Sequence, residues 1–316
     1  MDAVPVINLQ EANSGNNKLD LIDRACRDHG FFILENHGIQ ESINSMWKAS
    51  EKFFKLSDMQ KSEIVRTDNK PLGYYDRELT KRKRDLKEVF DFMDPESSKN
   101  DFNQWPDDDF FKNEMSLFFR DASIIAEQTL RLIFKALTSN ITSFPSGTSE
   151  TSTVRLNFYP TEDPLLKENN IDVSNTGDMA LHHHTDPGVI TLLMQDMTGG
   201  LQALSKKYGW IDIPPSEDTI VVNLGDAMQV WTNDEYVAAI HRVLKRTDDP
   251  RYSTPYFYNP PRDEIIKPLR GVSNKPDLYK PFTWKEYIQG RIDDNYKDLG
   301  KEDIQISKFK ISHHPA

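Results

Sequence analysis

The first half of the chain alternates between helical and extended patterns of apolar residues. Residues 19–28 and 39–54 place apolar side chains three and four positions apart, which is the spacing of one face of an amphipathic helix. Residues 4–9 and 30–38 are short apolar runs, so both are expected as strands. A longer helical pattern covers residues 121–138. The N-terminal region is therefore predicted as mixed α and β structure.

The period of the pattern changes in the second half. Short strand-like runs are separated there by Gly, Pro, Asn and Asp, and they cover residues 154–160, 179–186, 189–195, 201–214, 219–232, 236–246 and 251–260. Regular spacing of this kind is typical of an antiparallel sandwich or barrel. Tyr208–Gly209 is expected at a hairpin tip, and Gly225–Asp226 at a turn within the fifth run. A final helix is predicted over residues 284–296.

The charge balance limits the class of partner. The chain has 316 residues, 39 of them Lys or Arg and 50 Asp or Glu, which gives a formal net charge of −11. Nucleic-acid and anionic-membrane binding require a dominant basic face, so neither partner is expected. The length suits two domains or one large β-rich domain with helical additions.

The chain has one cysteine, Cys26, so it cannot form an intrachain disulfide or a Cys-rich zinc or iron–sulfur site. Any transition metal must therefore be held by His and carboxylate side chains. The N-terminus lacks a signal-peptide pattern, and no apolar run approaches the ~18 residues of a membrane span. We expect a cytoplasmic monomer.

His184 and Asp186 form the first chemical constellation. On a strand, residues i and i+2 point to the same face, so both side chains can converge on one metal ion. His241 lies in another strand-like run, among apolar residues. Two His and one carboxylate form the facial triad of non-haem Fe(II) oxygenases. The alternative is a chance His-x-Asp pair with a hydrogen-bonded structural histidine at position 241.

Arg251 and Ser253 form a second constellation on the next predicted strand. They share a face, and an Arg fork beside a hydroxyl is a natural receptor for a carboxylate. The alternative is a structural salt bridge of Arg251.

Together these motifs resemble a known family. His-Thr-Asp at 184–186, His241 and Arg-Tyr-Ser at 251–253 occur in the order and spacing of the Fe(II)/2-oxoglutarate-dependent dioxygenases. Arg-Leu-Asn-Phe-Tyr-Pro at 155–160 and the segment 30–39 resemble the isopenicillin N synthase-like subfamily. Phe158 stands where that subfamily usually has Tyr, and Thr161 where a second Pro is common.

The resemblance extends from about residue 4 to about residue 290 and implies a mainly β fold with helices. Its core is a double-stranded β-helix, or jelly roll, wrapped by an N-terminal α/β region and a C-terminal helix. The implied division is a mixed N-terminal region over 1–145, the jelly-roll core over 146–262, and a C-terminal segment over 263–316 that covers the active site.

The resemblance also implies the site. His184, Asp186 and His241 would hold Fe(II), and Arg251, Ser253, Tyr159 and Asn157 would hold 2-oxoglutarate. With dioxygen, and with ascorbate as a supporting reductant, such an enzyme oxidises an unactivated C–H bond of a small metabolite, often in specialised metabolism, and releases succinate and carbon dioxide. The outcome would be hydroxylation, desaturation or cyclisation.

Other functions are compatible with the same motifs. One is an iron oxidase of the same fold that performs oxidative ring closure without 2-oxoglutarate. A non-catalytic binding protein and a protein-hydroxylating enzyme are further alternatives, but the intact ligand set and the subfamily's small substrates argue against them.

Candidates for the substrate wall are the aromatic residues Tyr74, Tyr75, Phe92 and Tyr258, and core packing is the competing interpretation for each. His182 is a further candidate, and the alternative for it is a solvent-edge residue at the start of a strand. Residues 77–87 contain six basic residues and two acidic ones. If this block lay over the barrel mouth, it would attract an anionic, amino-acid-derived molecule. The alternative is a solvated basic helix face.

Overall fold

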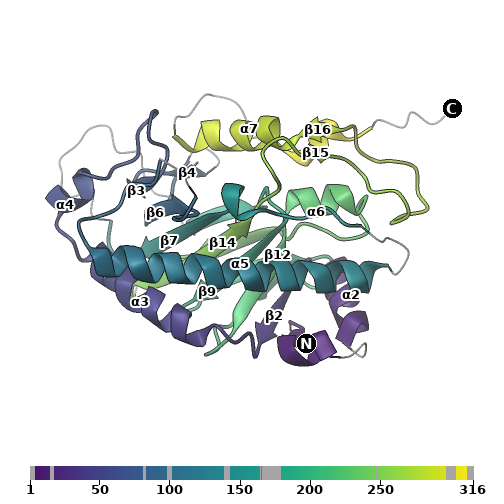
Figure 1. The fold of residues 1–316 in the computed structure, drawn as a ribbon, viewed down its shortest axis with the longest axis horizontal. Coiled ribbons are helices and arrows are strands. Elements are labelled where there is room, and N and C mark those ends of the chain that lie inside the picture. The colour runs from purple at the N-terminus through teal and green to yellow at the C-terminus, as the bar shows by residue number, and fades with distance from the viewer. Residues whose placement is uncertain are drawn as a thin grey trace.

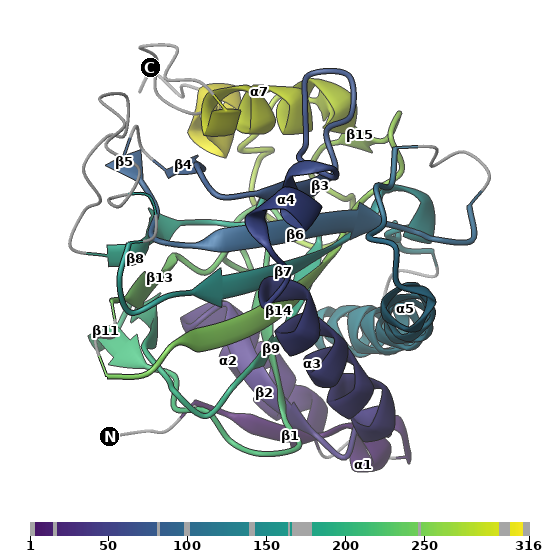
Figure 2. The same ribbon diagram turned by 90° about the vertical axis from the view of Figure 1, so that its left-hand side faces the viewer.

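The computed structural model describes residues 4–14, 18–80, 83–97, 102–138, 143–163, 165, 179–245, 248–296 and 304–311. Within these ranges the chain forms two main β-sheets and two short strand pairs, and long helices cover the outer face of the larger sheet (Figures 1 and 2).

The larger sheet joins strands from both halves of the chain. From one edge to the other its order is β1 (Val6–Asn8), β2 (Phe31–Glu35), β12 (Ile220–Leu224), β9 (Ile190–Gln195), β14 (Arg251–Tyr258), β7 (Thr153–Tyr159), β6 (Glu88–Met93) and β3 (Gly73–Tyr75). β1 and β2 are parallel, and the remaining pairs are antiparallel. Since this sheet crosses the expected boundary at residue 145, the division into 1–145, 146–262 and 263–316 stays a prediction.

The smaller sheet is antiparallel and has the order β11 (Gly209–Asp212), β10 (Leu201–Ser205), β13 (His241–Leu244) and β8 (Met179–His184). Two short strand pairs accompany the sheets, β4 (Leu79–Thr80) with β5 (Lys83–Arg84) and β15 (Ile265–Ile266) with β16 (Phe282–Thr283). A cluster of buried residues, the inner core, joins both sheets: Val4, Phe31, Ile33, Tyr159, Ala180, Leu201, Ala203, Ile213, Val221, Ala239 and Val243. Two sheets around a shared core form the predicted jelly roll.

The helices are α1 (Leu9–Ser14), α2 (Leu19–Asp28), α3 (Gln40–Phe54), α4 (Asp58–Ser62), α5 (Asp109–Leu137), α6 (Asp226–Trp231) and α7 (Trp284–Tyr296), with 3-10 turns η2 (Ser149–Thr151) and η4 (Ile306–Phe309). Helices α2, α3 and α5 bury their apolar faces against the larger sheet and form a second cluster, the outer core (Figure 1). None of the helices in the described ranges combines the length and apolarity needed to cross a bilayer.

The predicted helices over 19–28 and 284–296 are confirmed, and α3 begins one residue after the expected start. Helix α5 begins much earlier than expected, at Asp109. Asp108 caps it by accepting hydrogen bonds from the backbone N–H groups of Phe110 and Phe111. Phe111, Met115 and Phe118 then continue the buried stripe toward the N-terminus.

The expected strand over residues 219–232 is wrong beyond Leu224. β12 ends there, and Gly225 begins the short helix α6. The backbone N–H of Asp226 donates to the Asp186 carbonyl at 2.8 Å, which fixes α6 against the loop after β8. A Cβ on Gly225 would lie 2.2 Å from the Gly188 carbonyl oxygen, so only glycine permits this approach.

Candidate metal centre

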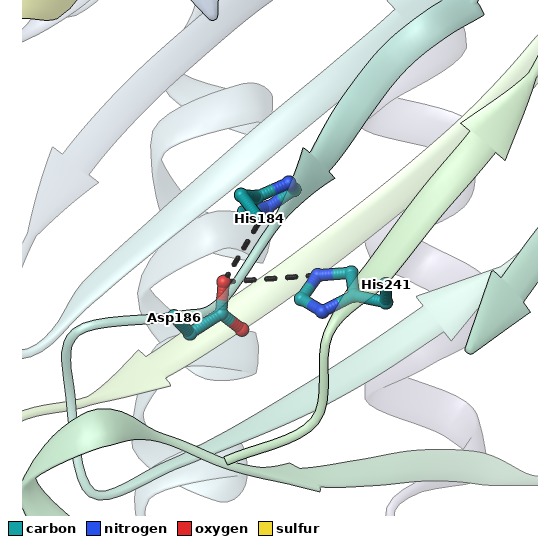
Figure 3. A group of neighbouring side chains, drawn as sticks. All are labelled: His184, Asp186 and His241. Atoms are coloured by element: carbon teal, nitrogen blue, oxygen red, sulfur yellow. Dashed lines mark ion pairs between the residues drawn. The ribbon is translucent and has the colours of Figure 1, made fainter. Parts of the chain in front are cut away.

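Three side chains converge at the ends of two strands of the smaller sheet. His184 is the last residue of β8, His241 is the first residue of β13, and the two lie opposite each other in the ladder. Asp186 follows β8 in the adjoining loop (Figure 3). Its Oδ1 lies 3.6 Å from His184 Nε2 and 3.7 Å from His241 Nε2. The sequence prediction that these residues come together is confirmed.

Backbone carbonyls fix both imidazole rings. His184 Nδ1 donates to the His182 carbonyl at 2.8 Å, and His241 Nδ1 donates to the Ala239 carbonyl at 3.0 Å. A carbonyl oxygen can only accept, so Nδ1 carries the hydrogen in both rings. Nε2 is therefore the ring nitrogen that faces Asp186 in each histidine.

The carboxylate of Asp186 is held by the larger sheet. Its Oδ2 accepts hydrogen bonds from Thr191 Oγ1 of β9 at 2.6 Å and from Asn223 Nδ2 of β12 at 2.8 Å. Oδ1 is left to face the two histidines. Neither Thr191 nor Asn223 was predicted as a site residue from the sequence. An amide inside the apolar run Ile-Val-Val-Asn-Leu was the available signal, because a buried polar group needs a partner.

The shifted pKa values of His184 and Asp186 favour the binding of a cation. Burial, together with the neighbouring His241, lowers the pKa of His184 to about 3. Burial alone would raise the pKa of Asp186, but the two histidines and its two hydrogen bonds hold that pKa below its ordinary value. At neutral pH the site therefore offers a neutral imidazole at His184 and a carboxylate at Asp186.

The donor set fits iron. Two imidazole nitrogens and one carboxylate oxygen lie within 4.8 Å of one another, and all three belong to residues with supporting hydrogen bonds. Two histidines and one carboxylate on one side of a metal leave coordination positions open, which is the arrangement of non-haem Fe(II) oxygenases.

A buried guanidinium lies on the larger sheet beside the inner core. Arg251 is 1% exposed, its Nε donates to the Gly199 carbonyl at 2.9 Å, and its Nη1 has no hydrogen-bond partner among the described residues. A small pocket reaches this side chain, lined by Leu86, Tyr159, Pro160, Ala180, Leu244, Lys245 and Arg251. No described carboxylate pairs with Arg251, which excludes the salt-bridge alternative within that part of the chain.

The register of β14 and β7 brings four predicted residues together. Arg251 lies opposite Tyr159, and Ser253 lies opposite Asn157. Asn157 Nδ2 donates to Ser253 Oγ at 3.4 Å. All four are buried, so a cation, two hydroxyls and an amide form one polar cluster in an apolar wall.

Three residues that were predicted to line the substrate wall lie away from the metal triad. Tyr74, Phe92 and Tyr258 are buried in the outer core, between the larger sheet and the helices. Tyr258 OH donates to the Gly147 carbonyl, and Tyr74 OH donates to Glu88. These three predictions are wrong, since strand alternation turns the side chains to the face opposite the metal triad.

Tyr75 and His182 are placed differently. Tyr75 is half-buried, pairs with Val89 rather than joining the outer core, and lies beneath the Arg66 guanidinium at 4.1 Å. His182 Nδ1 lies 3.2 Å from Asp85 Oδ1, on the segment that borders the Arg251 pocket. Both stay candidates for the substrate wall.

The basic block is not a solvated helix in its described part. Strands β4 and β5 occupy it, and Arg84 and Lys87 are buried. Arg84 pairs with Asp163, and Lys87 pairs with Glu78 at 2.9 Å. These two cations are therefore neutralised, whereas Lys81 and Arg82 lie outside the described residues.

Known proteins resemble this chain in sequence and in fold. The 2OG-Fe(II) oxygenase superfamily matches residues 150–260, and the family described as "non-haem dioxygenase in morphine synthesis N-terminal" matches residues 4–108. The chain is 30% identical over 304 residues to DMR6-like oxygenase 2 of Arabidopsis thaliana, covering 91% of this chain and 83% of the relative. It is 32% identical over 300 residues to 1-aminocyclopropane-1-carboxylate oxidase 4 of Solanum lycopersicum, covering 92% and 90%.

A solved structure agrees with these sequence relatives. A full-length Neurospora crassa protein, crystallised in complex with alpha-KG, is 28% identical and has a TM-score of 0.78. The match covers 92% of this chain and 96% of that chain. Iron and 2-oxoglutarate are accordingly the metal and the cosubstrate of this enzyme. The chain belongs to the Fe(II)- and 2-oxoglutarate-dependent dioxygenases.

Proposed function

We propose that this enzyme oxidises an unactivated C–H bond of a small metabolite, with Fe(II) held by His184, Asp186 and His241. The observation that carries the assignment is the set of three donor atoms, Nε2 of His184, Nε2 of His241 and Oδ1 of Asp186, whose residues are fixed by hydrogen bonds through other atoms. When bound, iron and 2-oxoglutarate supply the oxidising power, with release of succinate and carbon dioxide.

We further propose that Arg251 and Ser253 bind the far carboxylate of 2-oxoglutarate, with Tyr159 and Asn157 beside them. The support is the orphan Nη1 of Arg251 in a recess that reaches the smaller sheet at Ala180. A guanidinium with a neighbouring hydroxyl suits the planar carboxylate and gives it a fixed direction. Asn157 holds Ser253 through its amide, which orients the hydroxyl.

The barrel wall supports the chemistry by keeping water away from the reacting groups. Apolar residues of the inner core, such as Ala180, Ala203 and Val243, surround the space between the two sheets. Because the electrostatic interactions of the polar cluster strengthen in a water-poor site, the apolar wall favours tight binding of the cosubstrate.

The test is turnover by the full-length protein with Fe(II), 2-oxoglutarate, ascorbate and pools of small metabolites. We expect succinate and oxidised metabolite in equal amounts, and no turnover by Asp186→Ala. Iron-dependent oxygen consumption and ring closure without succinate would replace this proposal with the oxidase alternative. Binding of metabolites without any oxygen consumption would indicate the non-catalytic alternative.

A further inference from the structure

A second buried guanidinium lies directly beside the metal triad. Arg291 of α7 is 8% exposed, and its Nη2 donates to the Thr185 carbonyl at 2.6 Å. Thr185 is the residue between His184 and Asp186. The C-terminal helix therefore places a cation against the backbone of the triad, although the sequence analysis assigned this helix no chemical role.

The charge of Arg291 is only partly matched by protein groups in the described part of the chain. Its Nη1 is buried and has no hydrogen-bond partner, and no described carboxylate forms an ion pair with it. Arg291 does act on Asp226, but burial outweighs that attraction and leaves the pKa of the Asp226 carboxyl raised. Burying a cation without a close anion is strongly unfavourable. Arg251, the proposed receptor of 2-oxoglutarate, has the same feature, a buried Nη1 without a partner.

Arg291 is held in place by rigid elements. One turn earlier in α7, Tyr287 OH donates to Asp226 Oδ2 at 2.6 Å, and Asp226 N–H donates to the Asp186 carbonyl at 2.8 Å. Residues four apart lie on one helix face, so Tyr287 and Arg291 attach the same side of α7 to the loop after β8, which carries Asp186. A Cβ on Gly290 would lie 2.7 Å from the Ile304 side chain, so the helix is also held from another side.

We propose that Arg291 binds a carboxylate of the substrate, which makes small carboxylic acids the substrate class. The inference rests on the proposed function, in which the two carboxylates of 2-oxoglutarate meet the metal and Arg251. The orphan Nη1 of Arg291 is then available to a third carboxylate. A planar guanidinium fork fits that group, and its contact with Thr185 places the bound molecule next to the metal.

The proposal is tested with small aromatic and alicyclic carboxylic acids, each paired with its methyl ester and its primary amide. Two measurements are made on wild type, Arg291→Gln and Arg291→Lys. The first is the shift in melting temperature of the metal-free protein on adding each compound. The second is the stimulation of succinate formation by the enzyme loaded with Fe(II) and 2-oxoglutarate. Lys285→Gln, which removes an exposed cation from the same helix, is the matched control.

We expect acids, but not their esters or amides, to stabilise the wild-type protein and to stimulate turnover. Arg291→Gln should weaken acid binding about 10- to 100-fold, the range for loss of a charge-assisted hydrogen bond. Arg291→Lys should retain part of the binding, and Lys285→Gln all of it. The visible absorption of the Fe(II)–2-oxoglutarate complex should be unchanged in every variant.

Failure of the carboxylate assignment can be distinguished from failure of the proposed function. A wild-type protein that forms no Fe(II)–2-oxoglutarate absorption contradicts the proposed function itself. A complex that forms but responds equally to acids and esters, or to no acid in the panel, overturns the carboxylate assignment alone. Loss of metal and cosubstrate absorption in Arg291→Gln would make Arg291 a structural clamp of the triad loop instead.

Discussion

Arg251 lies opposite Tyr159 in the β14–β7 ladder, with the guanidinium carbon 5.0 Å from the ring centroid. The aromatic ring covers one face of the cation, and the Gly199 carbonyl takes the Nε hydrogen. Nη2 donates to Gln195 Oε1 at 3.4 Å, so Nη1 is the guanidinium nitrogen left without a hydrogen-bond partner among the described residues. An incoming carboxylate is therefore expected to pair with Nη1.

Replacing Arg251 tests the cosubstrate site. Arg251→Lys should raise the KM for 2-oxoglutarate about 10- to 100-fold, because an ammonium group supplies no planar fork. Binding of Fe(II) should be unchanged, since Arg251 contacts none of the three proposed ligands. Steady-state kinetics and iron titration measure the two effects, with the exposed Arg131→Lys as control. An unchanged KM in Arg251→Lys would contradict the assignment.

Thr191 is expected to act through Asp186. Thr191→Val removes one hydrogen bond to Oδ2 while keeping the shape of the side chain, so the carboxylate loses part of its orientation. Iron affinity should fall about 10- to 100-fold, as is usual for the loss of a group that orients a metal ligand. Iron titration gives the affinity, and circular dichroism checks the fold. Affinity equal to wild type would show that Asn223 alone positions the carboxylate.

The depressed pKa of His184 predicts acid sensitivity of the metal-free protein. In the unfolded chain this histidine binds a proton below its ordinary pKa of 6.5, whereas in the fold it stays neutral until pH is about 3. The unfolded state therefore binds more protons between these values, and stability falls as pH falls through that window. Melting temperatures from pH 7.5 to 5 should drop less in His184→Gln than in wild type. Parallel curves would refute the assignment.

Gly225 is predicted to be essential to the loop that carries Asp186. In Gly225→Ala the new Cβ would lie 2.2 Å from a backbone carbonyl, so α6 or the loop must move. We expect a stability loss of about 1–3 kcal/mol, as for overpacking, together with weaker iron binding. Urea unfolding and iron titration measure both.

Gly209→Ala is the matched control for that prediction. The backbone of Gly209 has a positive φ of 71°, which disfavours any side chain. An added Cβ would meet no atom within 4 Å, so no steric contact adds to this strain. It should lose stability, about 1–2 kcal/mol from backbone strain alone, without weaker iron binding. Equal iron affinity in both variants would show that the Gly225 contact does not position Asp186.

The metal triad and the cosubstrate cluster were predictable because their information is local. His184 with Asp186 and Arg251 with Ser253 are pairs two positions apart, and antiparallel pairing then brings the strands together. Strand alternation also argues against Tyr258 as a substrate residue. It lies an odd number of positions from Arg251 on the same strand, so the two side chains point to opposite faces. Counting along β14 would have placed its side chain in the outer core.

The remaining features depend on tertiary contacts. Arg291 and Tyr287 look like an ordinary helix face in the sequence, and their role appears only where α7 meets the loop after β8. Neutralisation of Arg84 in the basic block could not be predicted, because its partner Asp163 lies far away along the chain. Net charge within a window says nothing about charges that the fold brings in from elsewhere.

The position of Arg291 in the chain also has a consequence for biosynthesis. A polypeptide emerging from the ribosome presents His184, Asp186 and His241 well before it presents α7. A shortened product that ends before this helix would keep every proposed metal ligand and lose the proposed anchor for substrate. Such a fragment would also lose the contacts of Tyr287 and Arg291 with Asp226 and Thr185, so synthesis of the site is complete only when the last helix has been made.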